Sequence, residues 1–287
     1  MKKLKEYGRF IKVEHTIFSF PLILAGAFMG FGAGGEAMPS MSWVRLVLLI
    51  LLAGFGARIA ALGLNRIIDR EIDRLNPRTR VRELPSGSIS LTESMLVTGF
   101  GLVVYLVSAG LICDLVLYLS PIPLVVFVLY PYMKRFTPLC HFGVGAGLAL
   151  APIGGFVAAT CSFNGMLPAL LLGLFTFFWV SGFDIIYATL DEEFDRDYGL
   201  YSMVSRFGKR NALMVSGAVH ALAFLSLLTL YLLEFRSLFS IVLLLVTGCL
   251  LYLEQRRSSD VDLAFFRINA VVGFAVFLFV LSGIYLH

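Results

Sequence analysis

Two short acidic segments, far apart in the chain, combine residue types and spacings that are typical of a catalytic site. The first contains Asn65, Asp69 and Asp73, and the second contains Asp184, Asp191 and Asp195. Steps of four and seven residues bring side chains onto one face of an α-helix. Each segment therefore predicts a stripe of carboxylates along one helix.

Bound metal ions would explain why two such stripes occur together. Carboxylates at this spacing repel one another unless a cation compensates their charge. Mg²⁺ prefers oxygen ligands and commonly combines one or two protein carboxylates with phosphate oxygens of a substrate. Two facing stripes would hold such ions with a diphosphate between them. We expect the metal ligands to be Asn65, Asp69, Asp73, Asp191 and Asp195, and the four aspartates to be catalytic.

A simpler explanation exists for any single aspartate, because a charged residue at a helix end beside a loop is usually just solvated. The two segments, however, match each other in spacing. Asp191 follows Asp69 by the same number of residues as Asp195 follows Asp73. This match favours two similar helical units that present carboxylates to the same side of the molecule.

Basic and aromatic residues near the acidic segments complete the predicted site. Arginine and lysine bind phosphate oxygens, although basic residues beside a membrane often only orient the protein. Arg58 lies seven residues before Asn65, on the same face and inside an apolar run, where a guanidinium needs a carboxylate partner from the protein or a substrate. The predicted substrate-binding residues are Arg58, Asn65, Arg78, Arg82, Tyr130, Lys134, Asp184 and Tyr187.

The elements that position these residues are predicted to be transmembrane helices. The chain of 287 residues is 59% hydrophobic and 15% charged, and apolar runs of roughly 20 residues are long enough to cross a bilayer. The first run follows a basic stretch but is too long for a signal peptide, so we expect it to remain as a helix. The nine runs are 16–34, 42–64, 90–112, 114–133, 139–160, 166–187, 211–233, 236–253 and 264–286.

Together these runs predict an all-α integral membrane protein. We expect nine transmembrane helices in one domain, residues 1–287, arranged as two four-helix units plus a ninth helix around a central cavity. Of the 23 Lys and Arg residues, all except Arg45, Arg58 and Arg236 fall on one side of these helices. Because positive loops stay inside, we expect a protein of the cell (inner) membrane with a cytoplasmic N-terminus and its C-terminus outside.

The cysteines show no paired spacing. They lie singly in or beside apolar runs, without a CxxC motif, so we expect neither a disulfide framework nor a zinc site. We interpret them as packing residues. They are Cys113, Cys140, Cys161 and Cys249.

The acidic motifs resemble those of the UbiA superfamily of intramembrane aromatic prenyltransferases, in particular its 4-hydroxybenzoate polyprenyltransferase-like branch. The first family motif is Asn-Asp-x-x-Asp-x-x-x-Asp, which this chain matches except that Arg66 replaces the first Asp. The second, Asp-x-x-x-x-x-x-Asp-x-x-x-Asp, matches in full. Tyr130 and Lys134 match a Tyr-x-x-x-Lys element, and Arg58 matches an arginine before the first motif. Arg66 removes one possible ligand and leaves the coordination set open.

The resemblance implies a Mg²⁺-dependent prenyltransferase of quinone biosynthesis. It would transfer a polyprenyl group from polyprenyl diphosphate to a small aromatic acid such as 4-hydroxybenzoate, and Arg58 would bind the carboxylate of that acceptor. A dihydroxynaphthoate acceptor, for menaquinone made by the futalosine route, is an alternative. We expect both substrates and membrane lipid as partners, and no nucleic acid.

A secondary transporter is the competing class, because repeated helical units and polar residues within spans are also typical of transporters. Transport sites lie near the membrane midplane, however, whereas these carboxylates lie at one boundary. A structural scaffold would leave the matched stripes unexplained. The acceptor, the prenyl length and the oligomeric state are not determined by the sequence.

Overall fold

The computed structural model describes residues 2–12, 16–32, 41–261 and 267–286, and in these ranges the regular secondary structure is helical. A 3₁₀ turn, Thr189–Asp191, links α9 to α10. The α-helices are α1 (Lys2–Phe10), α2 (Thr16–Gly32), α3 (Trp43–Ile68), α4 (Arg70–Leu75), α5 (Leu91–Ile112), α6 (Asp114–Leu119), α7 (Pro121–Met133), α8 (Cys140–Thr160), α9 (Leu167–Ala188), α10 (Glu192–Asp197), α11 (Met203–Leu233), α12 (Leu238–Arg256) and α13 (Asn269–Tyr285).

The long helices coincide with the apolar runs of the sequence. Seven spans in the described residues are long and apolar enough to cross a membrane, with α6 and α7 together forming one of them. The remaining two runs correspond to α2 and α13, which are shorter, at 17 residues each. The count of nine crossings and their grouping into two four-helix units therefore remain predictions, and parts of the first and last runs lie outside the described residues.

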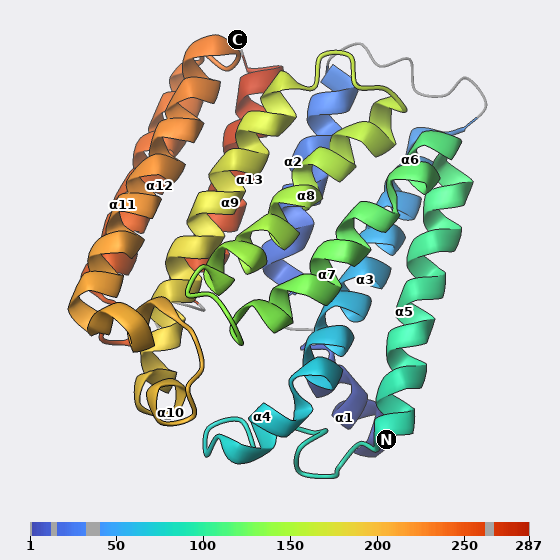
Figure 1. Cartoon of the computed structure of the whole chain (residues 1–287). Coiled ribbons are helices and arrows are strands. Elements are labelled where there is room, and N and C mark those ends of the chain that lie inside the picture. Colours follow the sequence, from blue (N-terminus) through green and yellow to red (C-terminus); the bar gives the residue numbers. More distant parts are fainter. Residues whose placement is uncertain (1, 13–15, 33–40, 262–266, 287) are drawn as a thin grey trace.

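The helices stand side by side, and the short helices α4 and α10 lie together at one end of the bundle, the end that also carries α1 (Figure 1). Helix α3 packs on α5, α2 on α8, and α9 on both α8 and α11. The last turn of α13 lies at the opposite end (Figure 1). This arrangement brings the ends of α3 and α9, which carry the acidic segments, to one side of the molecule.

Glycines allow α2 and α8 to approach closely. A Cβ atom at Gly26 would lie 1.9 Å from the carbonyl oxygen of Pro152, and one at Gly155 would lie 2.1 Å from that of Ile23. Small residues permit such backbone contacts between helices in lipid, where packing rather than water exclusion holds helices together. These two positions fix how near α8, which lines the site, can come to α2.

Both acidic segments contain a helix break, where the sequence predicted a continuous stripe. Helix α3 ends before Asp69, which has φ −93° and ψ 3°, and α4 begins after it. The second segment breaks at Asp191, with φ −112° and ψ 10°. The bridge region that both occupy is one where active-site residues often lie. Each stripe is therefore interrupted at the second of its three polar residues, Asp69 or Asp191, instead of following one continuous helix.

The prediction for two of the cysteines is wrong. Cys113, at the end of α5, and Cys161, at the end of α8, form a disulfide with a Cα–Cα distance of 6.5 Å. They lie 48 residues apart in sequence, so local spacing gives no signal of the pairing. Cys140 and Cys249 are free. The disulfide lies at the end of the bundle opposite α4 and α10.

Candidate active site

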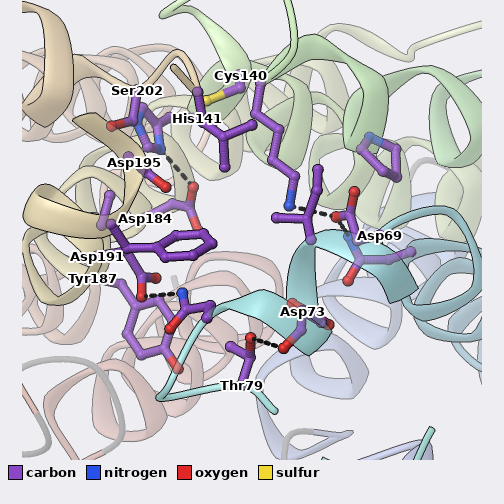
Figure 2. A pocket seen from close by; sticks show the side chains of 18 of the residues that line it. Asp69, Asp73, Thr79, Cys140, His141, Asp184, Tyr187, Asp191, Asp195 and Ser202 are labelled. Carbon is purple, nitrogen blue, oxygen red and sulfur yellow. Dashed lines mark hydrogen bonds and ion pairs between the residues drawn. The ribbon is translucent and has the colours of Figure 1, made fainter. Parts of the chain in front are cut away.

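One polar cavity, with a volume of about 210 Å³, is lined by both acidic segments. Figure 2 shows Asp69 and Asp73 on one side of it, facing Asp184, Asp191 and Asp195 on the other. Every predicted site residue except Arg58 lines this cavity. They are Asn65, Asp69, Asp73, Arg78, Arg82, Tyr130, Lys134, Asp184, Tyr187, Asp191 and Asp195.

The first acidic segment is neutralised by basic side chains from two elements. Lys134 Nζ lies 2.7 Å from Asp69 Oδ2, and Arg82 Nη1 donates to Asp73 Oδ2 over 2.9 Å. Asn65 Nδ2 also donates to Asp69 Oδ2, over 3.1 Å. Burial raises the pKa of the Asp69 carboxyl above its ordinary value, and the ammonium of Lys134 opposes this shift. Lys134 and Arg82 therefore hold the two carboxylates of this segment at the cavity wall.

The second acidic segment is held by the loop that follows the first. Arg78 donates from Nε to Asp191 Oδ1 over 2.8 Å and from Nη2 to Asp191 Oδ2, which makes a two-pronged ion pair. Arg78 Nη1 also donates to the hydroxyl of Tyr187 over 2.7 Å. Asn76 Nδ2 also donates to Asp191 Oδ1, over 2.8 Å. The loop that carries Asn76 and Arg78 thus connects the two acidic walls of the cavity.

Asp184, two helical turns before Asp191 in the chain, is bound by a histidine that the sequence did not single out. His141 Nδ1 lies 2.7 Å from Asp184 Oδ2. The backbone N–H of Met203 donates to His141 Nε2 over 3.2 Å, so that nitrogen carries the lone pair and Nδ1 carries the proton. His141 therefore donates to Asp184 and fixes its direction. Neither His141 nor Asn76 has a sequence spacing that would reveal these contacts.

Arg58 belongs to a second, mostly apolar cavity of about 250 Å³ that adjoins the first. Tyr130 and Val144 line both cavities, whereas Arg58 lines only the apolar one. Arg58 therefore lies in the lining of the adjoining cavity, and its role in substrate binding stays a prediction. Arg58 and Asn65 are on one helix, but the polar cavity begins about two turns further along it.

Comparison with known proteins identifies the family. A model described as the UbiA prenyltransferase family matches residues 19–271. The chain belongs to this family. It is therefore a prenyltransferase, and its apolar helices together with the family indicate a multi-pass membrane protein.

Relatives in the UbiA family match this chain over nearly its full length. It is 28% identical over 288 residues to a 4-hydroxybenzoate octaprenyltransferase of Coxiella burnetii, covering 98% of this chain and 96% of the relative. It is 30% identical to one of Yersinia enterocolitica, with 96% and 95% covered. A UbiA homolog from Aeropyrum pernix K1 in its apo form superposes with a TM-score of 0.83 at 32% identity, covering 94% of this chain and 97% of that one. A UbiA homolog from Archaeoglobus fulgidus, described as bound to GPP and Mg²⁺, has the same fold, with a TM-score of 0.69, 21% identity, and 97% and 98% covered.

Arg66, the residue that departs from the UbiA motif, does not line the polar cavity. Its side chain is buried, and Nη1 lies 3.1 Å from Glu83 Oε2. The guanidinium also lies over the ring of Phe10, 5.5 Å from its centre. Arg66 thus joins α3 to the loop after the first motif and to α1. At this motif position the Arg66 side chain therefore holds the loop and does not form part of the cavity wall.

The polar cavity of this UbiA protein fits a hard divalent cation that is shared with a substrate. Asp69 Oδ1 is buried and accepts no hydrogen bond, although Arg135 Nη2 lies 3.5 Å away. The atoms available to bind a metal ion are carboxylate and carboxamide oxygens, which suit Mg²⁺. Within the described residues, no three His, Cys, Asp or Glu side chains converge on one metal position. A metal ion here would therefore need oxygens from a bound substrate to complete its ligand set.

Proposed function

We propose that this chain transfers a polyprenyl group from a polyprenyl diphosphate to an aromatic acid such as 4-hydroxybenzoate, in a Mg²⁺-dependent reaction of quinone biosynthesis. One observation carries the proposal: a polar cavity with two acidic walls adjoins an apolar cavity, with Tyr130 and Val144 common to both. A polyprenyl diphosphate has the same two parts, a charged head and an apolar tail. The names of the octaprenyltransferase relatives support the choice of donor and acceptor.

In this proposal the diphosphate lies between the two acidic walls. Asp69 and Asp73 would hold metal from one wall, with Asn65 assisting, and Asp191 and Asp195 from the other. Bound Mg²⁺ would supply positive charge where negative charge develops on the leaving diphosphate. Because these carboxylates approach from opposite walls, one diphosphate can contact both groups.

The basic side chains of the cavity would exchange partners when the diphosphate binds. Lys134, Arg82 and Arg78 are paired with Asp69, Asp73 and Asp191, the same carboxylates that would bind metal. Once metal neutralises the carboxylates, each cation is free to bind a phosphate oxygen. The ion pairs thus keep both kinds of ligand in place beforehand and limit the reorganisation that substrate binding requires.

The apolar cavity would receive the prenyl tail. The acceptor ring would lie where the apolar cavity meets the polar one. Phe127 and Tyr130 line the apolar cavity, and their ring faces attract the positive charge of an allylic cation while excluding water. The carbon–oxygen bond to the diphosphate breaks, the acceptor ring forms the new carbon–carbon bond, and an aspartate or the departing diphosphate takes the ring proton. Arg58 is the candidate partner of the acceptor carboxylate, since it is the basic residue in the apolar lining.

The membrane orientation is also proposed. Lys and Arg residues concentrate on the side of α1, α4 and α10, which favours a cytoplasmic N-terminus and a C-terminus outside the cell membrane. The polar cavity then faces the cytoplasm, where water-soluble aromatic acids and Mg²⁺ are available.

The test is turnover by the purified protein, with product mass as the readout. The enzyme receives a polyprenyl diphosphate, Mg²⁺ and a panel that includes 4-hydroxybenzoate and a dihydroxynaphthoate. We expect prenylated 4-hydroxybenzoate, with product lost in Asp191→Asn and retained in the matched variant Asp197→Asn, whose side chain is exposed on α10. Equal turnover by Asp191→Asn and the unmodified chain would overturn the assignment, and product from the dihydroxynaphthoate alone would change the acceptor.

A further inference from the structure

A second group of buried polar side chains lies behind the polar cavity, although none of them lines it. Each residue of the group is at most 4% exposed. The group joins four helices, and we call it the α9 support. It consists of Trp179 on α9, Ser216 and His220 on α11, Glu254 near the end of α12, and Asn269 at the start of α13.

A chain of hydrogen bonds within the α9 support runs from α9 through α13 to α12. Trp179 Nε1 donates to Asn269 Oδ1 over 2.7 Å, and Asn269 Nδ2 donates to Glu254 Oε1 over 2.8 Å. Helix α13 packs mainly on α2 and α12. The two bonds therefore add a direct polar link from α9 to the C-terminal helices.

Helix α11 contacts the same stretch of α9 at Gly182. The His220 ring lies so close that a Cβ atom added at Gly182 would come within 2.3 Å of His220 Cδ2 and Nε2. Ser216 Oγ donates to the carbonyl oxygen of Gly182 over 2.8 Å. Glu254 Oε2 lies 3.9 Å from His220 Nε2, so the carboxylate of Glu254 contacts both parts of the α9 support.

The contact between His220 and Gly182 lies on the face of α9 that is turned away from the polar cavity. Asp184 follows Gly182 by two residues, and side chains two residues apart on an α-helix point about 200° apart. On the cavity side, Asp184 Oδ2 lies 2.7 Å from His141 Nδ1 of α8. The end of α9 is therefore held from both sides, by His141 and by the α9 support.

Stability alone does not explain why the α9 support is polar. Burial removes the hydration of a carboxylate and a carboxamide, and well-packed apolar residues in place of such groups are often neutral or stabilising. A hydrogen bond weakens steeply with distance and angle, so it is made at one relative position of two helices. The polar side chains of the α9 support therefore specify one position of α9 along its neighbours.

We infer that the α9 support positions the second acidic wall, because it holds the end of α9 where Asp184 and Asp191 face Asp69 across the polar cavity (Figure 2). The inference rests on the proposed function, since it requires that this wall binds the diphosphate through metal. The five residues of the α9 support are positioning residues, which act through α9 and do not touch the substrate.

Two substitutions at Glu254 separate its hydrogen bonds from its charge. Glu254→Gln keeps an oxygen for Asn269 and turns an N–H donor toward His220, whereas Glu254→Leu removes both contacts. Gly182→Ala is an independent change, because its Cβ forces α9 away from the His220 ring. Glu254→Leu and Gly182→Ala therefore displace α9 by different means.

Ser240→Ala is the matched control for the loss of a buried polar contact. Ser240 lies in the first turn of α12, the helix that carries Glu254, and its hydroxyl is 2.9 Å from that of Ser282 on α13. Both serines are buried. This variant weakens the contact between α12 and α13 at the opposite end of these helices, away from the α9 support.

The experiment uses the full chain in nanodiscs, well below the melting temperature of every variant. Calorimetry measures the Mg²⁺ concentration for half-maximal binding of a non-cleavable thio analogue of geranyl diphosphate, and turnover gives kcat and KM. Since a misplacement of about 1 Å can cost 10²-fold, we expect Glu254→Leu and Gly182→Ala to lower kcat by roughly 10- to 100-fold and to raise this Mg²⁺ concentration. The KM for the acceptor should change little, because its proposed partner, Arg58, is on α3. Glu254→Gln and Ser240→Ala should keep the unmodified kcat and Mg²⁺ requirement, even where the melting temperature falls.

An unchanged kcat and Mg²⁺ requirement in Glu254→Leu or in Gly182→Ala would overturn the inference and leave the proposed function intact. An equal loss in Ser240→Ala would also overturn it, because the effect would then follow stability. So would an equal loss in Glu254→Gln, because the charge and not the hydrogen bonds would then matter. If Glu254→Leu does not fold, Gly182→Ala decides. If the unmodified chain neither binds the analogue nor forms product, the proposed function fails instead.

Discussion

Asp69 and Asp191 occupy equivalent places in the two halves of the site. Each interrupts a membrane-spanning helix, each begins a short helix at the same end of the bundle, and each is paired with a basic side chain. They face each other across one polar cavity (Figure 2). Two similar helix ends therefore produce a site with acidic walls on both sides, which would suit a ligand with two phosphoryl groups once divalent cations lie between them.

Arg78 should be needed for its geometry and not only for its charge. Its guanidinium binds both oxygens of Asp191 and the hydroxyl of Tyr187, which a lysine cannot reproduce. We expect Arg78→Lys and Arg78→Met both to lower kcat/KM by about 10²-fold, a typical loss for one electrostatic contact in an active site. Steady-state kinetics check this, and a lysine variant with unchanged kinetics would contradict it.

Removal of divalent metal should abolish turnover reversibly. Chelation with EDTA is expected to stop product formation, and added Mg²⁺ to restore it, because the cavity oxygens and a diphosphate together complete the ligand set. In Asp73→Asn the Mg²⁺ concentration for half-maximal rate should rise at least tenfold. Glu71→Gln, whose side chain is 70% exposed on the same short helix, is the matched control. Turnover that is insensitive to EDTA would contradict the metal requirement.

The Arg66–Glu83 pair should contribute to stability rather than to chemistry. Removing one partner of a buried ion pair leaves the other charge uncompensated, so Arg66→Met should lower the free energy of unfolding by about 3 kcal/mol. Arg66→Met/Glu83→Leu should recover part of this loss, with a coupling energy of about 1 kcal/mol or more. Unfolding in detergent measures both values. Strict additivity would show that the two residues do not act as a pair.

The titration of Lys12 should make the free energy of unfolding depend on pH. Burial, together with the positive charge of Arg82, Arg66 and Arg78, lowers the pKa of its ammonium to about 8. The unfolded chain keeps the ordinary value of 10.5, so it binds more protons than the folded chain between these two values. The free energy of unfolding should therefore rise as pH increases from about 8 to 10.5. This slope should be smaller in Lys12→Met, and an identical slope would contradict the pKa shift.

The close approach of α2 and α8 predicts that Gly26 tolerates no side chain. Its added Cβ would lie 1.9 Å from a backbone oxygen of Pro152, so Gly26→Ala must push the two helices apart. We expect a large loss of thermal stability and of activity. Gly99→Ala, where a Cβ meets no atom within 4 Å, should instead be neutral or stabilising by up to about 1 kcal/mol. Equal melting temperatures for the two variants would exclude this packing.

Much of the fold was predictable, because lipid imposes long apolar helices that are visible in composition. The two acidic segments were also visible, since their spacing follows helical periodicity. The breaks at Asp69 and Asp191 were not, because no proline or glycine marks them and the partners of the two aspartates, Lys134 and Arg78, are brought to them by tertiary packing. Asp73 and Asp195 nevertheless line the cavity, since each short helix continues toward it.

The partners of the site were harder to predict than its carboxylates. His141 and Asn76 reach Asp184 and Asp191 only through tertiary packing, and neither has a local motif. The disulfide between Cys113 and Cys161 depends on two helix ends meeting, which sequence spacing does not encode. Arg66 is the clearest case. Its place in the motif suggests that a metal ligand has been lost, but its side chain instead forms an ion pair with Glu83.

The central claim is that both acidic walls bind one diphosphate through metal, and its most direct test is a binding measurement that involves no acceptor. Calorimetry with a non-cleavable thio analogue of geranyl diphosphate should show Mg²⁺-dependent binding to the unmodified chain. Asp69→Asn and Asp191→Asn should each abolish that Mg²⁺-dependent binding, whereas Asp197→Asn should retain it. If either of the first two variants binds the analogue with unchanged affinity and unchanged Mg²⁺ dependence, the two walls do not share one ligand and the account is wrong.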